Sequence, residues 1–447
     1  MKILALILTT TALTVATPAR ADDASLKAEI AALKAQLAAQ AAQLERLEAR
    51  TAQIDNAQIT TAKAVAALPA QTATAAATPS FETAGSSQSA TTIGGYGEAI
   101  YNGYLKDSSR NQADLRRVVL YVGHRFSDKL SLTTETEFEH AVTSGGGDPG
   151  EVAIEQAYLS YNFNPALNLK AGLFLMPFGF LNRNHEPTAF YGAERNEVET
   201  RIIPTTLREG GVGVFGTLPF GLSYDVGVTT GYDISKFDGP DAPLSSVHQE
   251  LAEAKAANLS IYGGLEYRGV PGLLIGGAIS SGNSTHSNAA FRRDPAQPDL
   301  SGIKARITLF DVHARYQIKG FDLKALYARG MIRQAAQITQ AFLAANALDD
   351  GDRPIVPKAF DGWLVEGAYT FNLGGETSLS PFARYERFNT QARLPLGLIA
   401  DPANRDKVLT SGLSFKPLPE VVFKVDYQKF FGNEENDRVN LGIGYNF

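Results

Sequence analysis

Between residue 93 and the last residue, the chain contains repeated segments in which apolar and polar residues alternate with a period of two. The final segment shows it best, because Val439, Leu441, Ile443, Tyr445 and Phe447 alternate with small or polar residues. Successive side chains of a β-strand point to opposite faces, so each such segment predicts a strand with one apolar face. The expected strands span residues 93–104, 113–126, 129–142, 150–163, 167–177, 210–218, 222–232, 257–269, 271–282, 303–318, 320–333, 360–373, 375–390, 406–416, 420–432 and 436–447.

The connections between these segments distinguish a membrane barrel from a soluble sandwich. Short connections of turn residues, such as Ser127-Asp128 and Gly374-Gly375, alternate with long ones near 178–209, 233–256, 283–302, 334–359 and 391–405. Short turns on one rim and long loops on the other are typical of outer-membrane barrels. An open sheet edge in hydrocarbon would leave backbone groups unpaired, so a spanning sheet must close. We therefore predict an all-β transmembrane fold, an antiparallel barrel of about 16 strands over 93–447.

The first 21 residues have the features of a signal peptide. Lys2 precedes an apolar stretch over 3–15, and Ala19-Arg20-Ala21 is a small-x-small site, so cleavage is expected before Asp22. An uncleaved anchor helix is the alternative, but its apolar stretch is short for roughly 30 Å of hydrocarbon. No later segment has the roughly 18 consecutive apolar residues of a membrane helix. The mature chain is therefore expected either in the periplasm or in the outer membrane.

Residues 22–68 show the spacing of a coiled coil. Leu26, Ile30, Leu33 and Leu37 begin a series of apolar residues separated alternately by four and three positions. We expect this helix to associate with copies of itself in the periplasm; a single amphipathic helix lying against its own barrel is the alternative. Residues 69–92 are rich in Ala, Thr, Ser, Gln and Pro and are expected to form a flexible linker.

Composition excludes several functions. The net charge of −6 becomes −8 after removal of the signal, which carries Lys2, Arg20 and no acidic residue, and this acidic balance argues against nucleic-acid binding. The chain has no cysteine, and its six histidines lack metal-ligand spacing. No G-x-S-x-G elbow, P-loop or dinucleotide motif is present. We therefore expect no enzyme, no cofactor and no metal site, although a triad on distant strands would leave no motif.

Several features in a fixed order resemble the phosphate-selective porin O and P family. They are the signal followed by a coiled coil, the run 154–161 (IEQAYLSY), the run 169–179 (LKAGLFLMPFG), and residues 201–213 beyond it. The resemblance covers 93–447 and is sharpest between 114 and 216. It implies a homotrimeric diffusion channel whose third loop, here 178–209, folds inward and narrows the pore. Phe447 also resembles the terminal signal that the barrel assembly machinery reads.

The charged residues of the expected pore are of both signs. The candidates for the pore constriction are Arg183, His185, Glu186, Arg195, Arg201 and Arg208. The candidates for the lumen wall are Arg117, Arg125, Glu135, Glu137, Glu139, Arg268, Arg315, Arg384, Lys424 and Arg438. Anion pores need rings of Arg and Lys, whereas a mixed wall produces a field across the pore that orients polar solutes. Salt bridges that stiffen the wall are the alternative interpretation of the same residues.

The sequence thus predicts a porin surrounded by outer-membrane lipid. Its water-filled channel would pass small polar or charged solutes passively, and the resemblance adds anions such as phosphate. The alternative is a structural or adhesive barrel that tethers the envelope or presents extracellular loops without significant conductance. The charged inner face favours the channel, because charges facing the lumen need water.

Overall fold

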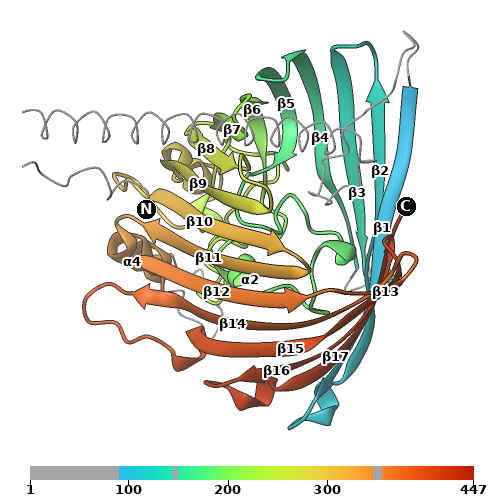
Figure 1. Ribbon diagram of the computed structural model, residues 1–447. Helices are drawn as coiled ribbons and strands as arrows, with labels where there is room; N and C mark the ends of the chain where they lie inside the picture. Colours follow the sequence, from blue (N-terminus) through green and yellow to red (C-terminus); the bar gives the residue numbers. More distant parts are fainter. Residues whose placement is uncertain (1–89, 144–149, 346–354) are drawn as a thin grey trace, which may run out of the picture. The chain divides into compact units, whose positions relative to one another are not determined.

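The computed structural model describes residues 90–143, 150–345 and 355–447, which form an antiparallel barrel (Figure 1). The expected signal peptide and coiled coil lie outside the described residues, and so does the expected linker up to residue 89. The first strand begins at Ala90, three residues before the expected start of the barrel.

Sixteen strands make up the wall. In chain order the strand segments are β1 (Ala90–Tyr104), β2 (Gln112–Arg125), β3 (Leu130–Glu139), β4 (Glu151–Asn164), β5 (Leu167–Leu175), β6 (Arg208–Thr217), β7 (Leu222–Thr229), β8 (Ser260–Tyr267), β9 (Leu273–Asn283), β10 (Arg306–Ile318), β11 (Phe321–Ile332), β12 (Ala359–Tyr369), β13 (Phe371–Gly374), β14 (Thr377–Arg393), β15 (Arg405–Leu418), β16 (Val421–Phe430) and β17 (Arg438–Asn446). β12 and β13 both pair with β14 and are two parts of one wall strand, interrupted at Thr370. The strand prediction is confirmed, since each expected strand end lies within three residues of an observed one.

The barrel closes where its first and last strands meet. β1 pairs with β2 on one side and with β17 on the other. At the end of the chain, the Phe447 amide donates to the Gly95 carbonyl at 2.9 Å and the Gly95 amide donates to the Phe447 carbonyl at 3.1 Å. Closure leaves no sheet edge, which satisfies the backbone groups that lipid could not.

The two faces of each strand differ as the alternation requires. On β10, Val312 points outward and is 55% exposed, whereas its neighbours Asp311 and His313 point inward and are buried. An apolar outer face suits lipid, and the inward polar residues need partners inside the barrel. Among the residues that the structure describes, no helix combines the length and the apolar composition that crossing a membrane requires.

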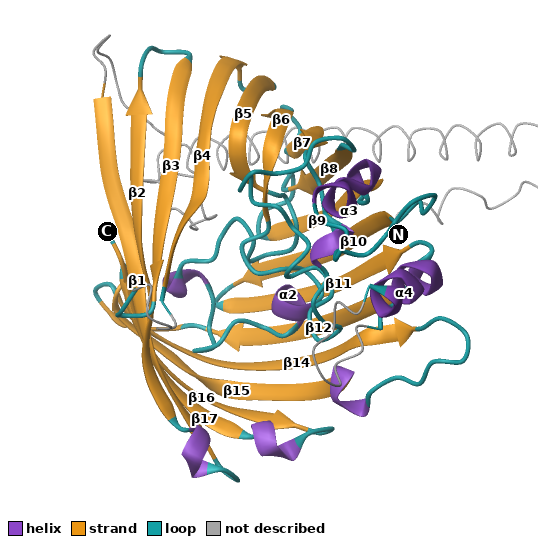
Figure 2. Ribbon diagram, turned by 180° about the vertical axis from the view of Figure 1, so that it is seen from behind, coloured by secondary structure: helices purple, strands orange, loops and turns teal. Residues whose placement is uncertain are grey.

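The helices lie in the long connections. α2 (Val198–Arg201) lies in the connection between β5 and β6, α3 (Ala289–Arg293) in that between β9 and β10, and α4 (Ala335–Ala344) in that between β11 and β12. Figure 2 shows α3 and α4 near the strand ends from which the long connections leave, and α2 within the ring of strands. The 3-10 turns are η1 (Ser108–Arg110), η2 (Pro187–Ala189), η3 (Ile234–Lys236), η4 (His286–Asn288), η5 (Pro402–Asn404) and η6 (Glu434–Asn436).

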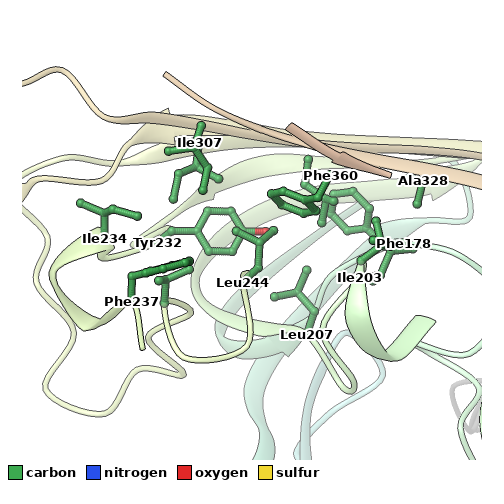
Figure 3. Close-up of a cluster of buried hydrophobic side chains, with 14 of the residues drawn as sticks. Phe178, Ile203, Leu207, Tyr232, Ile234, Phe237, Leu244, Ile307, Ala328 and Phe360 are labelled. Atoms are coloured by element: carbon green, nitrogen blue, oxygen red, sulfur yellow. The ribbon is translucent and has the colours of Figure 1, made fainter. Parts of the chain in front are cut away.

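Part of the barrel interior is apolar, in contrast to the charged inner face expected from the sequence. On β10, the inward residues Ile307 and Leu309 are fully buried and belong to a hydrophobic cluster. The cluster also contains Leu244 of the connection 230–259 and Ile338 of α4. Figure 3 shows Phe178, Ile203 and Leu207 of the β5–β6 connection converging on it. The connections near this end of the strands are therefore packed together inside the barrel rather than extended into solvent.

Candidate channel constriction

The connection between β5 and β6, residues 176–207, crosses the interior of the barrel and is here called the constriction loop. Its backbone is attached to the opposite wall: the Ala193 amide donates to Asp426 of β16 at 2.6 Å, and the Glu197 amide donates to Glu386 of β14 at 2.7 Å. Both carboxylates are buried beneath the loop. Hydrogen bonds to a charged acceptor are among the stronger ones, so the wall fixes the path of the loop.

The two ends of the constriction loop are joined to each other. The Asn182 side chain donates to the carbonyls of Met176 and Leu207, at 2.7 and 2.8 Å, and accepts a hydrogen bond from the Leu207 amide. Within the loop, Glu199 accepts hydrogen bonds from the backbone amides of Phe180 and Leu181. Burial raises the pKa of Glu199 above its ordinary value, although these amides act in the opposite direction.

Gly179 is required by this arrangement. Its φ is +57°, and an added Cβ would stand 2.2 Å from the Glu199 carboxylate. Any other residue would therefore displace the carboxylate that organises the turn. The turn at Gly179 therefore has one defined backbone conformation, which sets the positions of the side chains that follow it in the loop.

Arg183 is the candidate that reaches open space. Its side chain is 42% exposed, and its guanidinium lies 3.9 Å from the Asp225 carboxylate of β7. Arg201 is 30% exposed but is bonded to Glu197 at 2.5 Å, and its guanidinium lies 4.9 Å from the centre of the Phe388 ring. Of these two arginines, Arg183 is therefore the more exposed and the less tightly paired.

Two further arginine candidates are engaged inside the protein. Arg195 donates to the His185 carbonyl at 3.2 Å, and burial lowers its pKa, as does the nearby guanidinium of Arg117. Arg208 is the first residue of β6 and bonds to Glu250 of the 230–259 connection at 2.7 Å. Arg208 therefore belongs to the wall rather than to the loop, and its charge is neutralised there.

His185 lies between the loop and two wall strands. Its Nε2 is 3.4 Å from the Glu155 carboxylate of β4 and 3.8 Å from that of Glu135 of β3. Burial alone lowers the pKa of the imidazole, but the Glu155 carboxylate raises it to about 9. Glu186, the next residue, is partly buried, and one of its carboxylate oxygens has no hydrogen-bond partner.

Glu155 was missed as a site residue because a β-bulge alters the alternation. Glu135 of β3 pairs with Gln156, while the next residue, Thr136, pairs with Ile154. Glu155 is thus the extra residue of β4, and both it and Gln156 are buried on the inner face. Bulges redirect side chains in this way. A Glu-Gln pair inside an otherwise alternating strand was the available signal.

Most of the wall candidates form ion pairs. Arg117 of β2 bonds to Glu98 of β1 and Glu137 of β3, both at 2.9 Å, and lies 3.8 Å from Glu139. Arg384 of β14 is 3.0 Å from Glu386. The interpretation of these residues as wall-stiffening salt bridges thus has direct geometric support.

The other wall candidates are placed as follows. Arg315 bonds to Asp322 at 2.6 Å, Arg268 to Glu266 at 3.0 Å, Arg438 to Gln428 at 2.7 Å, Lys424 to the Gly192 carbonyl at 2.8 Å, and Glu135 to Gln156 at 2.6 Å, while Arg125 is the last residue of β2. Lys424 also stands 3.6 Å from the centre of the Phe190 ring. These contacts place Lys424 under the constriction loop. Arg268 lies in the short turn between β8 and β9.

Comparison with known proteins agrees with this architecture. A model of the phosphate-selective porin O and P family matches residues 95–207. An uncharacterized protein of Aquifex aeolicus (strain VF5) is 31% identical over 360 residues, which is 79% of each chain. Salmonella typhi OmpF, in a complex with daunomycin, has the same fold with a TM-score of 0.53 and 15% identity, over 80% of this chain and 97% of that one.

A further solved structure, the anion-selective porin from Comamonas acidovorans, matches at a TM-score of 0.46 and 12% identity, over 80% of this chain and 100% of that one. The family and the fold support an outer-membrane location and point to a channel rather than an enzyme. The expected resemblance is therefore confirmed: the chain belongs to the phosphate-selective porin O and P family.

Proposed function

We propose that this chain forms a passive channel for small polar and charged solutes, with the constriction loop as its narrowest part. The attachment of the loop to the inner wall, through Asp426 and Glu386, is the observation that carries this proposal. A barrel of about sixteen strands is wide enough to hold water, and a loop fixed across it determines the size of solute that passes.

The proposed channel has a weak preference for anions, phosphate included. Arg183 extends from the loop with 42% of its side chain exposed. Many of the wall cations are instead paired with carboxylates, as Arg117 is with Glu98 and Glu137. An exposed cation such as Arg183 attracts anions, but without the concentrated field of a ring of Arg or Lys. Phosphate would therefore pass as one of many small anions.

The proposed assembly is a homotrimer held in register by the periplasmic helices of residues 22–68. Their apolar residues hold heptad spacing, which supports self-association. Deleting 22–68 while keeping the signal peptide should weaken trimers on native gels but leave conducting barrels. Fully stable trimers from the deleted chain would contradict this role. The proposed signal for the assembly machinery is Phe447.

A structural or adhesive barrel remains the second candidate, and the hydrophobic cluster is what favours it. Residues such as Leu244, Ile307 and Phe360 fill part of the interior. If they and the loop left no continuous water path, the barrel would not conduct. The charged residues near Arg183 favour the channel instead, because exposed charges inside a barrel require water.

Solute uptake into liposomes tests the proposal. Purified protein is reconstituted, and swelling is followed with neutral sugars of increasing size. The proposal expects rates that fall with sugar size and vanish in protein-free liposomes. Absence of swelling with the smallest sugar, from protein that migrates as a folded barrel, would favour the structural alternative.

A further inference from the structure

Buried polar atoms without partners gather where the constriction loop meets β3 and β4. His185 is 3% exposed and Glu155 0%, yet the Nε2 of His185 and both carboxylate oxygens of Glu155 have no hydrogen-bond partner. The hydroxyl of Tyr96, whose ring packs edge-on against His185, is also unpartnered. Buried polar atoms without hydrogen bonds are destabilising, so a bound ion that contacts them would stabilise the cluster.

The distances fit a metal ion. The Nε2 of His185 lies 3.4 Å from a Glu155 oxygen and 3.8 Å from a Glu135 oxygen, and the three ligand atoms all lie within 4.8 Å of one another. Zinc binds nitrogen and carboxylate oxygen at about 2.0–2.2 Å, which puts tetrahedral ligands roughly 3.4 Å apart. The His185–Glu155 distance already fits this spacing, whereas pairs as far apart as 4.8 Å would have to approach by up to about 1.4 Å through rotation of the side chains, with water as the fourth ligand.

The surrounding hydrogen bonds orient the three ligands. His185 Nδ1 is bonded to the Asn182 carbonyl at 3.2 Å, which leaves Nε2 directed at the carboxylates. The Gln156 side chain donates to one oxygen of Glu135 at 2.6 Å, which leaves the other oxygen facing His185. Histidines that bind metals almost always donate their second ring nitrogen in this way.

The β4 bulge supplies the third ligand. A regular strand would direct only one of the adjacent residues Glu155 and Gln156 inward, but the bulge directs both. One of them becomes the third ligand and the other orients Glu135. No metal site was expected from the sequence, because the three ligands come from β3, β4 and the loop and share no regular spacing.

We propose that Glu135, Glu155 and His185 bind one divalent transition-metal ion of the zinc class, which fastens the constriction loop to β3 and β4. Two carboxylates neutralise the charge of the ion in this buried site. An imidazole nitrogen together with carboxylate oxygens suits zinc better than the all-oxygen preference of calcium or magnesium. The proposal adds a structural metal to the channel and does not depend on conductance.

Zinc titration of the untagged, full-length protein in detergent tests the proposal. After treatment with EDTA and desalting, isothermal titration calorimetry with zinc chloride should give one saturable site per chain. His185→Gln and Glu155→Gln should each weaken binding by about tenfold or more. His313→Gln is the matched control, because its imidazole also faces two carboxylates, of Asp311 at 2.6 Å and Glu266 at 3.9 Å. Its affinity should equal that of the wild type.

Two results would overturn the proposal. The first is wild-type protein with no saturable zinc binding, which would leave a proton between His185 and Glu155 as the occupant. The second is unchanged affinity in His185→Gln, which would place the zinc elsewhere. If His185→Gln does not fold, the zinc affinity of the isosteric variant Glu155→Gln tests the site instead. X-ray absorption of the zinc-loaded wild type should show one imidazole and otherwise oxygen ligands; several imidazoles would equally contradict the site.

Discussion

Lys424 and Asp426, two residues apart on the inner face of β16, bind opposite backbone groups of adjacent residues in the constriction loop. The Lys424 ammonium donates to the Gly192 carbonyl at 2.8 Å, and the Asp426 carboxylate accepts from the Ala193 amide at 2.6 Å. Both charged groups are therefore bonded to the loop backbone rather than directed freely into the lumen. These two wall charges therefore hold the loop at Gly192 and Ala193.

Asp426→Ala should release this part of the loop. The change removes a charge-assisted hydrogen bond whose net contribution is about 1.5–3 kcal/mol. We expect larger and noisier single-channel currents than in the wild type. Asp406→Ala is the control, because Asp406 also accepts backbone amides, of Gly432 and Asn433, but lies outside the constriction loop. Equal current noise in the two variants would contradict the positioning role.

Arg183→Gln should reduce the preference for anions. A unit charge about 4 Å from a passing ion is worth about 1 kcal/mol in water, so the ratio of anion to cation permeability should fall by a few-fold. Zero-current potentials in a potassium chloride gradient measure this ratio. Arg268→Gln removes a comparably exposed arginine, 44% against 42%, in a short turn at the rim, and should have the smaller effect. A larger fall in the permeability ratio in Arg268→Gln than in Arg183→Gln would mean that Arg183 does not set the ion selectivity.

Leu244→Ala should loosen the hydrophobic cluster. Leu244 is 1% exposed, and truncating a buried leucine costs about 2–5 kcal/mol. The connection 230–259 should then be cut faster by trypsin at Lys236 or Lys255, while the barrel stays folded. Leu259→Ala, at a residue 55% exposed, is the control for the same substitution nearby. Cleavage rates like those of the wild type would mean that the cluster does not hold this connection.

Phe447→Ser should lower the yield of assembled barrel in the outer membrane. The Phe447 backbone pairs with Gly95, but its side chain is 70% exposed, so the change removes an aromatic group without removing ladder hydrogen bonds. The measurement is the fraction of protein that migrates as a folded barrel before heating. Phe423→Ser makes the same change on the outer face of β16, where the side chain is 44% exposed. An equal loss in both variants would indicate lipid contact rather than a terminal signal.

The sequence located the strands well because the alternation of β-strands is local. On β10, the outward Val312 and the inward Asp311 and His313 could be assigned from sequence order alone. The confirmed strand positions follow from this period of two, together with turns that fix where each strand begins.

The candidate site was less predictable because its contacts depend on distance in space. His185 meets Glu155 only because the loop returns to the wall and a bulge redirects one side chain. Arg208 was assigned to the loop from its position in the chain, yet it lies on β6 and pairs with Glu250. The pairing of charges over long sequence separations leaves no periodic signal.

The inward apolar residues were missed for a related reason. Ile307 and Leu309 continue the inner face of β10, but their partners come from connections whose folded path no local pattern specifies. A strand that is apolar on both faces at one end is the sequence feature that indicates such packing.

The deciding experiment for the proposed channel is single-channel recording in a planar bilayer. We predict steady, ohmic channels in potassium chloride, with a weak anion preference and no block of the chloride current by low phosphate concentrations. Block by low phosphate would show a specific phosphate site and contradict the proposed weak selectivity. Absence of any conductance from folded, inserted protein would contradict the channel itself.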